Sequence, residues 1–214
     1  MIFGFIGAAR NEFGRSHPRL QSNLETQLGV SPPWWALVFT LIADGTLFAS
    51  LLFGTLYLWI SAPNWPPAQT FTPDLGLALA AVVALLVAAA AARGSQRSIS
   101  AGGTARGWIG LAAPGLVVAI AVVVGLIGDI VPRPTEHALG ATAAALLAYV
   151  AFHAGIGLLF LLSNLLRLRG GFLSSRRSMD PHLTRLWLDY TVVTGVIALG
   201  LVSALPALVR SLGT

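Results

Sequence analysis

The chain of 214 residues contains no cysteine and no lysine, and only 10% of its residues are charged. The absence of cysteine excludes disulfides, thiolate metal sites, iron–sulfur clusters and cysteine nucleophiles. The scarcity of charge leaves too little polar surface to coat a soluble domain of this length, because 56% of the residues are hydrophobic and the mean hydropathy is +0.78. The sequence therefore predicts a membrane protein that crosses the bilayer several times.

Five apolar stretches are long enough to cross a hydrocarbon core, which takes about 20 residues of helix. They cover residues 34–60, 75–92, 108–127, 138–166 and 186–209. The predicted fold class is all-α, a bundle of five transmembrane helices. Two parts follow: a cytoplasmic or interfacial segment, 1–33, and the five-helix domain, 34–214. Pro114, near the start of the third stretch, predicts a kink or a late helix start.

All thirteen basic residues are arginines, and eleven of them lie in three places. Three are in the N-terminal segment, three in a predicted loop over 93–106, and five in a predicted loop over 167–185. Because basic residues collect on the cytoplasmic side of a membrane, the N-terminus is predicted in the cytoplasm and the C-terminus on the opposite side. Arginines confined to short loops are a topology signal, so we expect no nucleic-acid partner.

One acid, Asp44, lies about ten residues into the first predicted span. A charge at such a depth costs about 2.5 to 3.5 kcal/mol by insertion measurements, so the carboxyl is expected to have a partner. Two interpretations stay open. Asp44 is either a hydrogen-bonded acid that packs its helix against a neighbour, or a carboxyl in a proton-handling or lipid-headgroup site.

The fourth predicted span contains His153, the only histidine within a span. A haem or copper site needs two or more ligands at compatible spacing, so we expect a neutral packing histidine and no metal bound by this chain. Beside it, Gly155 and Gly157 predict a face suited to close helix contact. Asp189 is predicted in the first turn of the fifth helix, near Arg185, where a carboxylate favours the helix N-terminus.

Further polar side chains within the predicted spans are Thr40, Thr46, Tyr149, Ser163, Asn164, Tyr190, Thr191 and Thr194. No Ser-His-Asp set, phosphate-binding loop or HExxH motif accompanies them. We therefore expect no catalytic centre in this chain.

Three segments carry a resemblance to a known family. The first span and its exit, IADGTLFASLLFGTLYLW and then APNWPP, resemble subunit III of haem–copper cytochrome c oxidases, where a helix carries an acid followed by an apolar, aromatic-rich run. FHAGIGLLFLL is similar to the histidine-bearing helix of that family. RLRGGFLSSRRSMDPHLTRLWLDYTVVTGVI is similar to its arginine-rich cytoplasmic turn and last helix. The similarity covers most of residues 34–205 and is closest to the five-helix form fused behind subunit I in some bacterial oxidases.

The sequence also departs from that pattern. Asp44 stands where the family usually has glutamate, and His153 matches one histidine of a pair whose companion is absent. Asp189 stands where the last helix usually has histidine, and Trp187 alone represents a tryptophan-rich pattern. The two helices that begin a full-length subunit III have no counterpart.

The resemblance implies a subunit without redox centres that packs against the catalytic subunit, supports proton uptake and protects the active site during turnover. Haem and copper then belong to partner subunits, with subunit I as the main partner and subunit II as a second, in a bacterial inner membrane. Asp44 and His153 are the candidate site residues, with Asp189 and Trp187 secondary. Candidate contacts of anionic lipid headgroups, or plain topology determinants, are Arg167, Arg169, Arg176 and Arg177.

Two alternatives stay open. One is a subunit III-like partner of a nitric oxide reductase, which shares the fold. The other is a small proton-coupled transporter with Asp44 and His153 as a relay. A transporter needs a polar path across the bilayer, and the second and third spans have almost no polar side chain to line one.

Overall fold

The computed structural model describes residues 32–61, 74–131, 133–173 and 178–204. These residues form five helices that are long and apolar enough to cross a membrane. They are α3 (Pro32–Ser61), α4 (Leu75–Ser100), α5 (Arg106–Gly128), α6 (Ala138–Arg169) and α7 (Met179–Leu199), and α7 continues into a π-helical turn, η1 (Gly200–Ala204). With no strand in the described ranges, the predicted all-α fold of a multi-pass membrane protein is confirmed. The predicted interfacial segment, up to residue 31, lies outside the described residues.

By its internal packing the chain divides into residues 1–40 and residues 41–214. In the first unit, the described residues are the opening turns of α3. There Trp35 stacks on Phe39 with ring centroids 5.8 Å apart, and the hydroxyl of Thr40 donates to the carbonyl of Ala36. The helix begins at Pro32, a position that tolerates proline because the first N–H groups of a helix have no partner within it.

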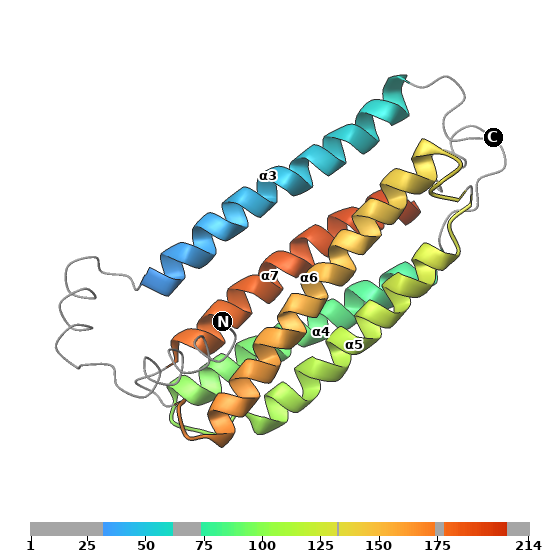
Figure 1. Cartoon of the computed structure of the whole chain (residues 1–214). Helices are drawn as coiled ribbons and strands as arrows, with labels where there is room; N and C mark the ends of the chain where they lie inside the picture. The colour runs from blue at the N-terminus through green and yellow to red at the C-terminus, as the bar shows by residue number, and fades with distance from the viewer. Residues whose placement is uncertain (1–31, 62–73, 132, 174–177, 205–214) are drawn as a thin grey trace, which may run out of the picture. The chain divides into compact units, whose positions relative to one another are not determined.

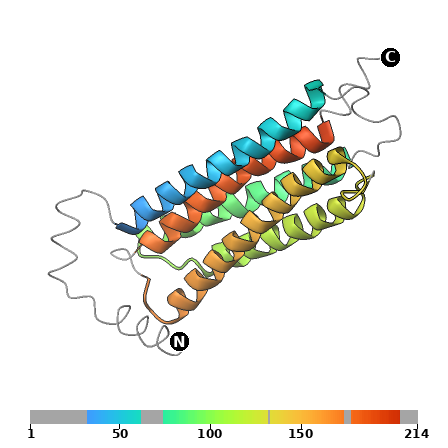
Figure 2. The same cartoon turned by 45° about the horizontal axis from the view of Figure 1, so that its top comes forward.

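In the second unit, α4, α5, α6 and α7 lie side by side, as Figure 1 and the turned view in Figure 2 both show. Each of α4 and α6 packs against both α5 and α7. Small residues allow the backbones to approach closely, as at Gly115, where an added Cβ would lie 3.1 Å from the carbonyl oxygen of Ala84. Most buried side chains of this bundle are alanine, leucine or valine, and the buried polar ones on α6 and α7 include His153, Asn164 and Thr191.

Two helix ends differ from the prediction. The segment 93–106 is not all loop, because α4 continues to Ser100, and α7 begins at Met179, before the predicted start at residue 186. Packing explains the extension of α4: Ile99 is buried, and an added Cβ at Gly94 would lie 2.5 Å from the ring of Trp108. A late helix start at Pro114 is also wrong, since α5 begins at Arg106 and continues through the proline.

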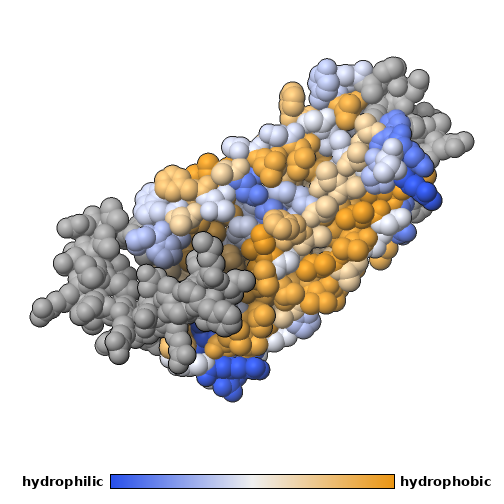
Figure 3. All heavy atoms as spheres, in the orientation of Figure 1, coloured by the Kyte–Doolittle hydropathy of each residue, from blue (hydrophilic) through white to orange (hydrophobic). Residues whose placement is uncertain are grey.

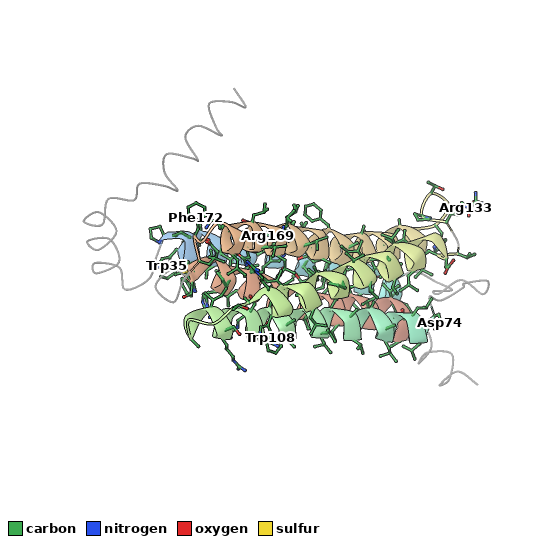
Figure 4. The ribbon with its side chains drawn as sticks, turned by 90° about the horizontal axis from the view of Figure 1, so that it is seen from below. Trp35, Asp74, Trp108, Arg133, Arg169 and Phe172 are labelled. Atoms are coloured by element: carbon green, nitrogen blue, oxygen red, sulfur yellow. The ribbon has the colours of Figure 1, made fainter. Side chains whose placement is uncertain are left out.

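The bundle has two chemically different ends. Figure 4 shows Arg169 and Phe172 at one end, here called the Arg169 end, and Asp74 and Arg133 at the other, here called the Asp74 end. Between them, Figure 3 shows hydrophobic residues along the helix sides in view. Six of the seven arginines among the described residues lie within about two helical turns of the Arg169 end. They are Arg93, Arg97, Arg106, Arg167, Arg169 and Arg185.

Candidate functional site

Asp44 is the meeting point of side chains from three helices. It lies near the middle of α3, and its Oδ2 accepts a hydrogen bond from the hydroxyl of Tyr149 on α6 and another, at 2.6 Å, from Tyr190 on α7. The Nε2 atom of His153, also on α6, lies 3.0 Å from the same oxygen. These four residues are called the Asp44 cluster below. The costly carboxyl therefore has the partners that its depth in the span requires.

The ring of His153 is fixed on every side. Its Nδ1 lies 2.8 Å from the carbonyl oxygen of Tyr149, and because a carbonyl only accepts, Nδ1 carries a proton. The ring stacks on Tyr149 at 4.0 Å and on Trp187 at 5.2 Å between centroids, and the side chain is only 2% exposed. The indole of Trp187 also donates to the carbonyl of His153 at 3.0 Å. Nε2 is thus left to face Asp44 alone.

The spacing of residues along each helix produces this arrangement. Tyr149 and His153 are four residues apart on α6, and residues at that spacing lie on one face of a helix. On α3, Phe48 stacks on Tyr149 with centroids 4.9 Å apart, four residues after Asp44. From the sequence, Tyr149 and Tyr190 were predicted only to be polar side chains within the spans, not members of a site. The four-residue spacing from Tyr149 to His153 is the signal that could have linked the tyrosine to the site.

The predicted small-residue face beside His153 is only partly in contact. At Gly157 an added Cβ would lie 2.5 Å from Leu188 and 3.6 Å from Trp187, so α6 and α7 approach closely there. At Gly155 no atom lies within 4 Å of an added Cβ. Gly157 therefore sets the helix contact that brings Trp187 to His153, and Gly155 does not.

Asp189 was predicted in the first turn of the fifth helix, and this prediction is wrong. The helix α7 begins at Met179, ten residues before Asp189. It pairs with Arg93 of α4 at 2.7 Å and with Arg185 at 3.4 Å. Consecutive helical residues point about 100° apart, so Asp189 faces α4 while the adjacent Tyr190 faces Asp44. Asp189 thus belongs to an ion-pair network separate from the Asp44 cluster.

The candidate lipid-contacting arginines have different environments. Arg167 donates to the carboxylate of Asp180 at the start of α7. Arg169 lies in the last turn of α6. Arg176 and Arg177 lie outside the described residues.

The seam between α6 and α7 is polar toward the Arg169 end. There the amide of Asn164 donates to the hydroxyl of Thr184 at 2.8 Å, one turn from the pair formed by Arg167 and Asp180. Leu161 and Leu188, both buried, separate these contacts from the Asp44 cluster.

Toward the Asp74 end, three hydroxyl groups bond to their own helices. Those of Ser50, Thr55 and Thr194 donate to carbonyls of the preceding turn. On the same side, an apolar groove is lined by Leu52 and Leu56 of α3 together with residues of α7 and η1. Polar side-chain contacts between α6 and α7 therefore lie on the Arg169 side of the Asp44 cluster, beyond the buried Leu161 and Leu188.

Among the described residues there is no group of three or more histidine, aspartate or glutamate side chains that could hold a metal ion. No protein-family profile matches the chain, and no curated protein matches its sequence. The Asp44 cluster is the feature on which a function can be proposed.

Proposed function

We propose that this chain is a non-redox, subunit III-like component of a haem–copper cytochrome c oxidase. One observation carries the proposal: the three segments that resemble subunit III meet at a single site. Asp44 comes from the first of these segments, His153 from the second, and Trp187 and Tyr190 from the third. The helices without family resemblance, α4 and α5, contribute none of these side chains.

In this proposal the Asp44 cluster supports the stability and proton uptake of the catalytic subunit. Carboxyl, imidazole and phenol groups all exchange protons, and here they lie next to one another midway along the spans. Haem and copper belong to subunits I and II. The Arg169 end faces the cytoplasm of a bacterial cell, with the N-terminus inside, because six arginines lie there.

A proton-coupled transporter fits these contacts less well. A relay through the bilayer needs polar side chains on both sides of Asp44 and His153. Toward the Asp74 end, the hydroxyls of Thr55 and Thr194 bond to their own helices, and the groove beside them is apolar. The contacts between α6 and α7 on the Arg169 side, beyond Leu161 and Leu188, favour proton exchange with that side over a relay across the bilayer.

Purification of a tagged chain from its native membrane in a gentle detergent tests the proposal. We expect co-purification of an oxidase subunit I and a haem band in the reduced-minus-oxidised visible spectrum. A nitric oxide reductase in the same preparation would support the alternative partner. A colourless chain that purifies alone would overturn the assignment and lead to flux assays in proteoliposomes.

The role of Asp44 is tested in the purified complex by Asp44→Leu, with Thr46→Leu as a matched control. Thr46 is an exposed residue of the same helix that bonds only its own backbone. We expect Asp44→Leu to shorten the turnover lifetime of the oxidase and to slow proton uptake, and Thr46→Leu to behave as wild type. If assembly, activity and lifetime are the same in both variants, Asp44 has no functional role.

The orientation can be tested because the chain has no native cysteine. Thr104→Cys places a single thiol at an exposed position between α4 and α5, near the Arg169 end, and Thr135→Cys places one at an exposed position between α5 and α6, near the Asp74 end. In intact spheroplasts, a membrane-impermeant maleimide is expected to label the thiol at position 135 and not that at 104. The reverse pattern would overturn the proposed topology.

We also propose that Arg169, together with Arg176 and Arg177, contacts anionic lipid headgroups at the cytoplasmic surface. Each basic residue near such a surface contributes about 1 kcal/mol. Arg167 is a weaker candidate, because its guanidinium is already paired with Asp180. Native mass spectrometry of the purified chain is expected to show retained phospholipid, and a lipid-free spectrum would remove this part of the proposal.

A further inference from the structure

A single oxygen atom in the Asp44 cluster has an unusual number of partners. Oδ2 of Asp44 is approached by the hydroxyls of Tyr149 and Tyr190 and by Nε2 of His153. The two hydroxyl oxygens also lie 2.8 Å from each other. Each hydroxyl has one proton, so when both donate to Oδ2, no proton lies between the two tyrosines.

The histidine limits where the remaining proton can be. Since Nδ1 of His153 already donates to the carbonyl of Tyr149, Nε2 either accepts from a protonated Asp44 or donates to an ionised one. Both arrangements have one proton between Nε2 and Oδ2, and both have zero net charge. The pair can therefore lie within the membrane in either form without an uncompensated charge.

The tyrosines distinguish the two forms. In the neutral form Oδ2 would be the hydroxyl oxygen of an acid, donating to His153 while it accepts from Tyr149 and Tyr190. In the ionised form it is a carboxylate oxygen, which accepts several hydrogen bonds and makes shorter, stronger ones. The 2.6 Å separation from Tyr190 is in the range of a charge-assisted O–H···O bond.

We infer that Asp44 and His153 form an ion pair that binds one shared proton on Nε2, and that the hydroxyls of Tyr149 and Tyr190 hold it there. The two tyrosines are positioning residues. Without their hydroxyl groups the Nε2–H bond breaks and an Oδ2–H bond forms, so the proton moves across one hydrogen bond and the net charge stays zero. This inference concerns the isolated chain and does not depend on the partner proposed above.

Other charged groups packed near the cluster face elsewhere. Next to Tyr190 on α7, Asp189 is paired with Arg93 and Arg185. The aromatic neighbours Phe48, Phe152 and Trp187 are not ionisable, and Trp187 bonds the backbone of His153. The proton position is thus set by the four residues of the cluster.

Nitrogen-15 solid-state NMR of the full chain in lipid bilayers tests this inference. Histidine is labelled, and the signal of His153 is assigned by its loss in His153→Gln. We expect both ring nitrogens of wild-type His153 to be protonated. In the double variant Tyr149→Phe with Tyr190→Phe, we expect Nε2 to lose its proton and the infrared carbonyl stretch of a protonated carboxylic acid to appear.

Tyr57→Phe is the matched control, because Tyr57 is the one tyrosine of the chain outside the Asp44 cluster and lies exposed on α3. It should leave the His153 signal and the infrared spectrum unchanged. A wild-type His153 with unprotonated Nε2 would overturn the ion pair, and an unchanged double variant would overturn the role of the tyrosines.

Asp44→Asn provides a second measurement if the double variant does not fold. Removal of the carboxylate is expected to leave His153 neutral, with a proton on Nδ1 only. Persistence of the imidazolium would overturn the shared proton. The NMR and infrared measurements use the chain without a partner subunit, so their outcomes do not test the proposed oxidase. Conversely, failure to isolate an oxidase would not change the expected protonation of His153.

Discussion

The contact between α6 and α7 that positions Trp187 can be tested by adding a single methyl group. Gly157→Ala places a Cβ 2.5 Å from a methyl of Leu188, whereas Gly155→Ala, two residues earlier on the same helix, places one in open space. Both variants make the same chemical change in the same helix. Any difference in stability between them therefore comes from packing.

The expected magnitude follows from two opposing effects. Replacing glycine by alanine within a helix stabilises it by about 0.5–1 kcal/mol. At position 157 the Leu188 methyl must also retreat by about 1 Å to reach an ordinary carbon–carbon separation. Leu188 is 1% exposed and has little room, so overpacking should cost about 1–3 kcal/mol. We expect Gly157→Ala to be about 1–3 kcal/mol less stable than Gly155→Ala.

Unfolding of the chain in mixed micelles, titrated with a denaturing detergent and followed by circular dichroism, measures this difference. The helical content of the folded variants and the wild type should agree before titration. Equal free energies of unfolding for the two alanine variants would refute the close contact at Gly157. A Gly157→Ala variant more stable than wild type would show that Leu188 moves aside freely.

Three further predictions use the same unfolding assay. Trp187→Phe removes the indole donor to the His153 carbonyl and should lower the free energy of unfolding by about 1 kcal/mol, and an unchanged value would refute this bond. Gly94→Ala places a Cβ 2.5 Å from the ring of Trp108 and should be about 1–3 kcal/mol less stable than Gly155→Ala, with equal stability of the two variants as the contradicting result. Asp189→Asn should change stability by at most about 1 kcal/mol, because its arginine partners are partly exposed, and a larger loss would indicate a buried network.

The number and order of the membrane-length helices in the described part of the chain could be predicted from the sequence because a membrane span has a strong hydropathy signal. The helix ends could not be predicted so well. Residues 93–100 at the end of α4 and residues 179–185 at the start of α7 are mostly polar, yet they are helical. Hydropathy marks the part of a helix that lies in lipid, whereas the helix continues as long as its backbone hydrogen bonds and packing, such as that of Ile99, sustain it.

The candidate site was predictable in part. Asp44 and His153 were identified because polar groups within a span are costly, and that argument needs no structure. Which side chains meet them depends on the rotation of each helix about its axis, which five generic apolar stretches do not specify. Asp189 illustrates the limit, since an error of seven residues in the start of α7 placed its carboxylate in the wrong turn.

Asp44 also determines how the middle of α3 is oriented. Ile42 and Phe53 on α3 are largely exposed. Because lipid is as apolar as the face of a neighbouring helix, burying such residues gives little preference for one rotation of α3 about its axis over another. The carboxyl does give one. Its insertion into the bilayer costs about 2.5 to 3.5 kcal/mol, and each hydrogen bond to a charged group contributes about 1.5 to 3 kcal/mol. Two or three such bonds therefore offset the cost. They form only when α3 is rotated so that Oδ2 faces Tyr190 and His153. The polar cluster, rather than the apolar surface, therefore fixes the face that residues 41–61 of α3 present to α6 and α7.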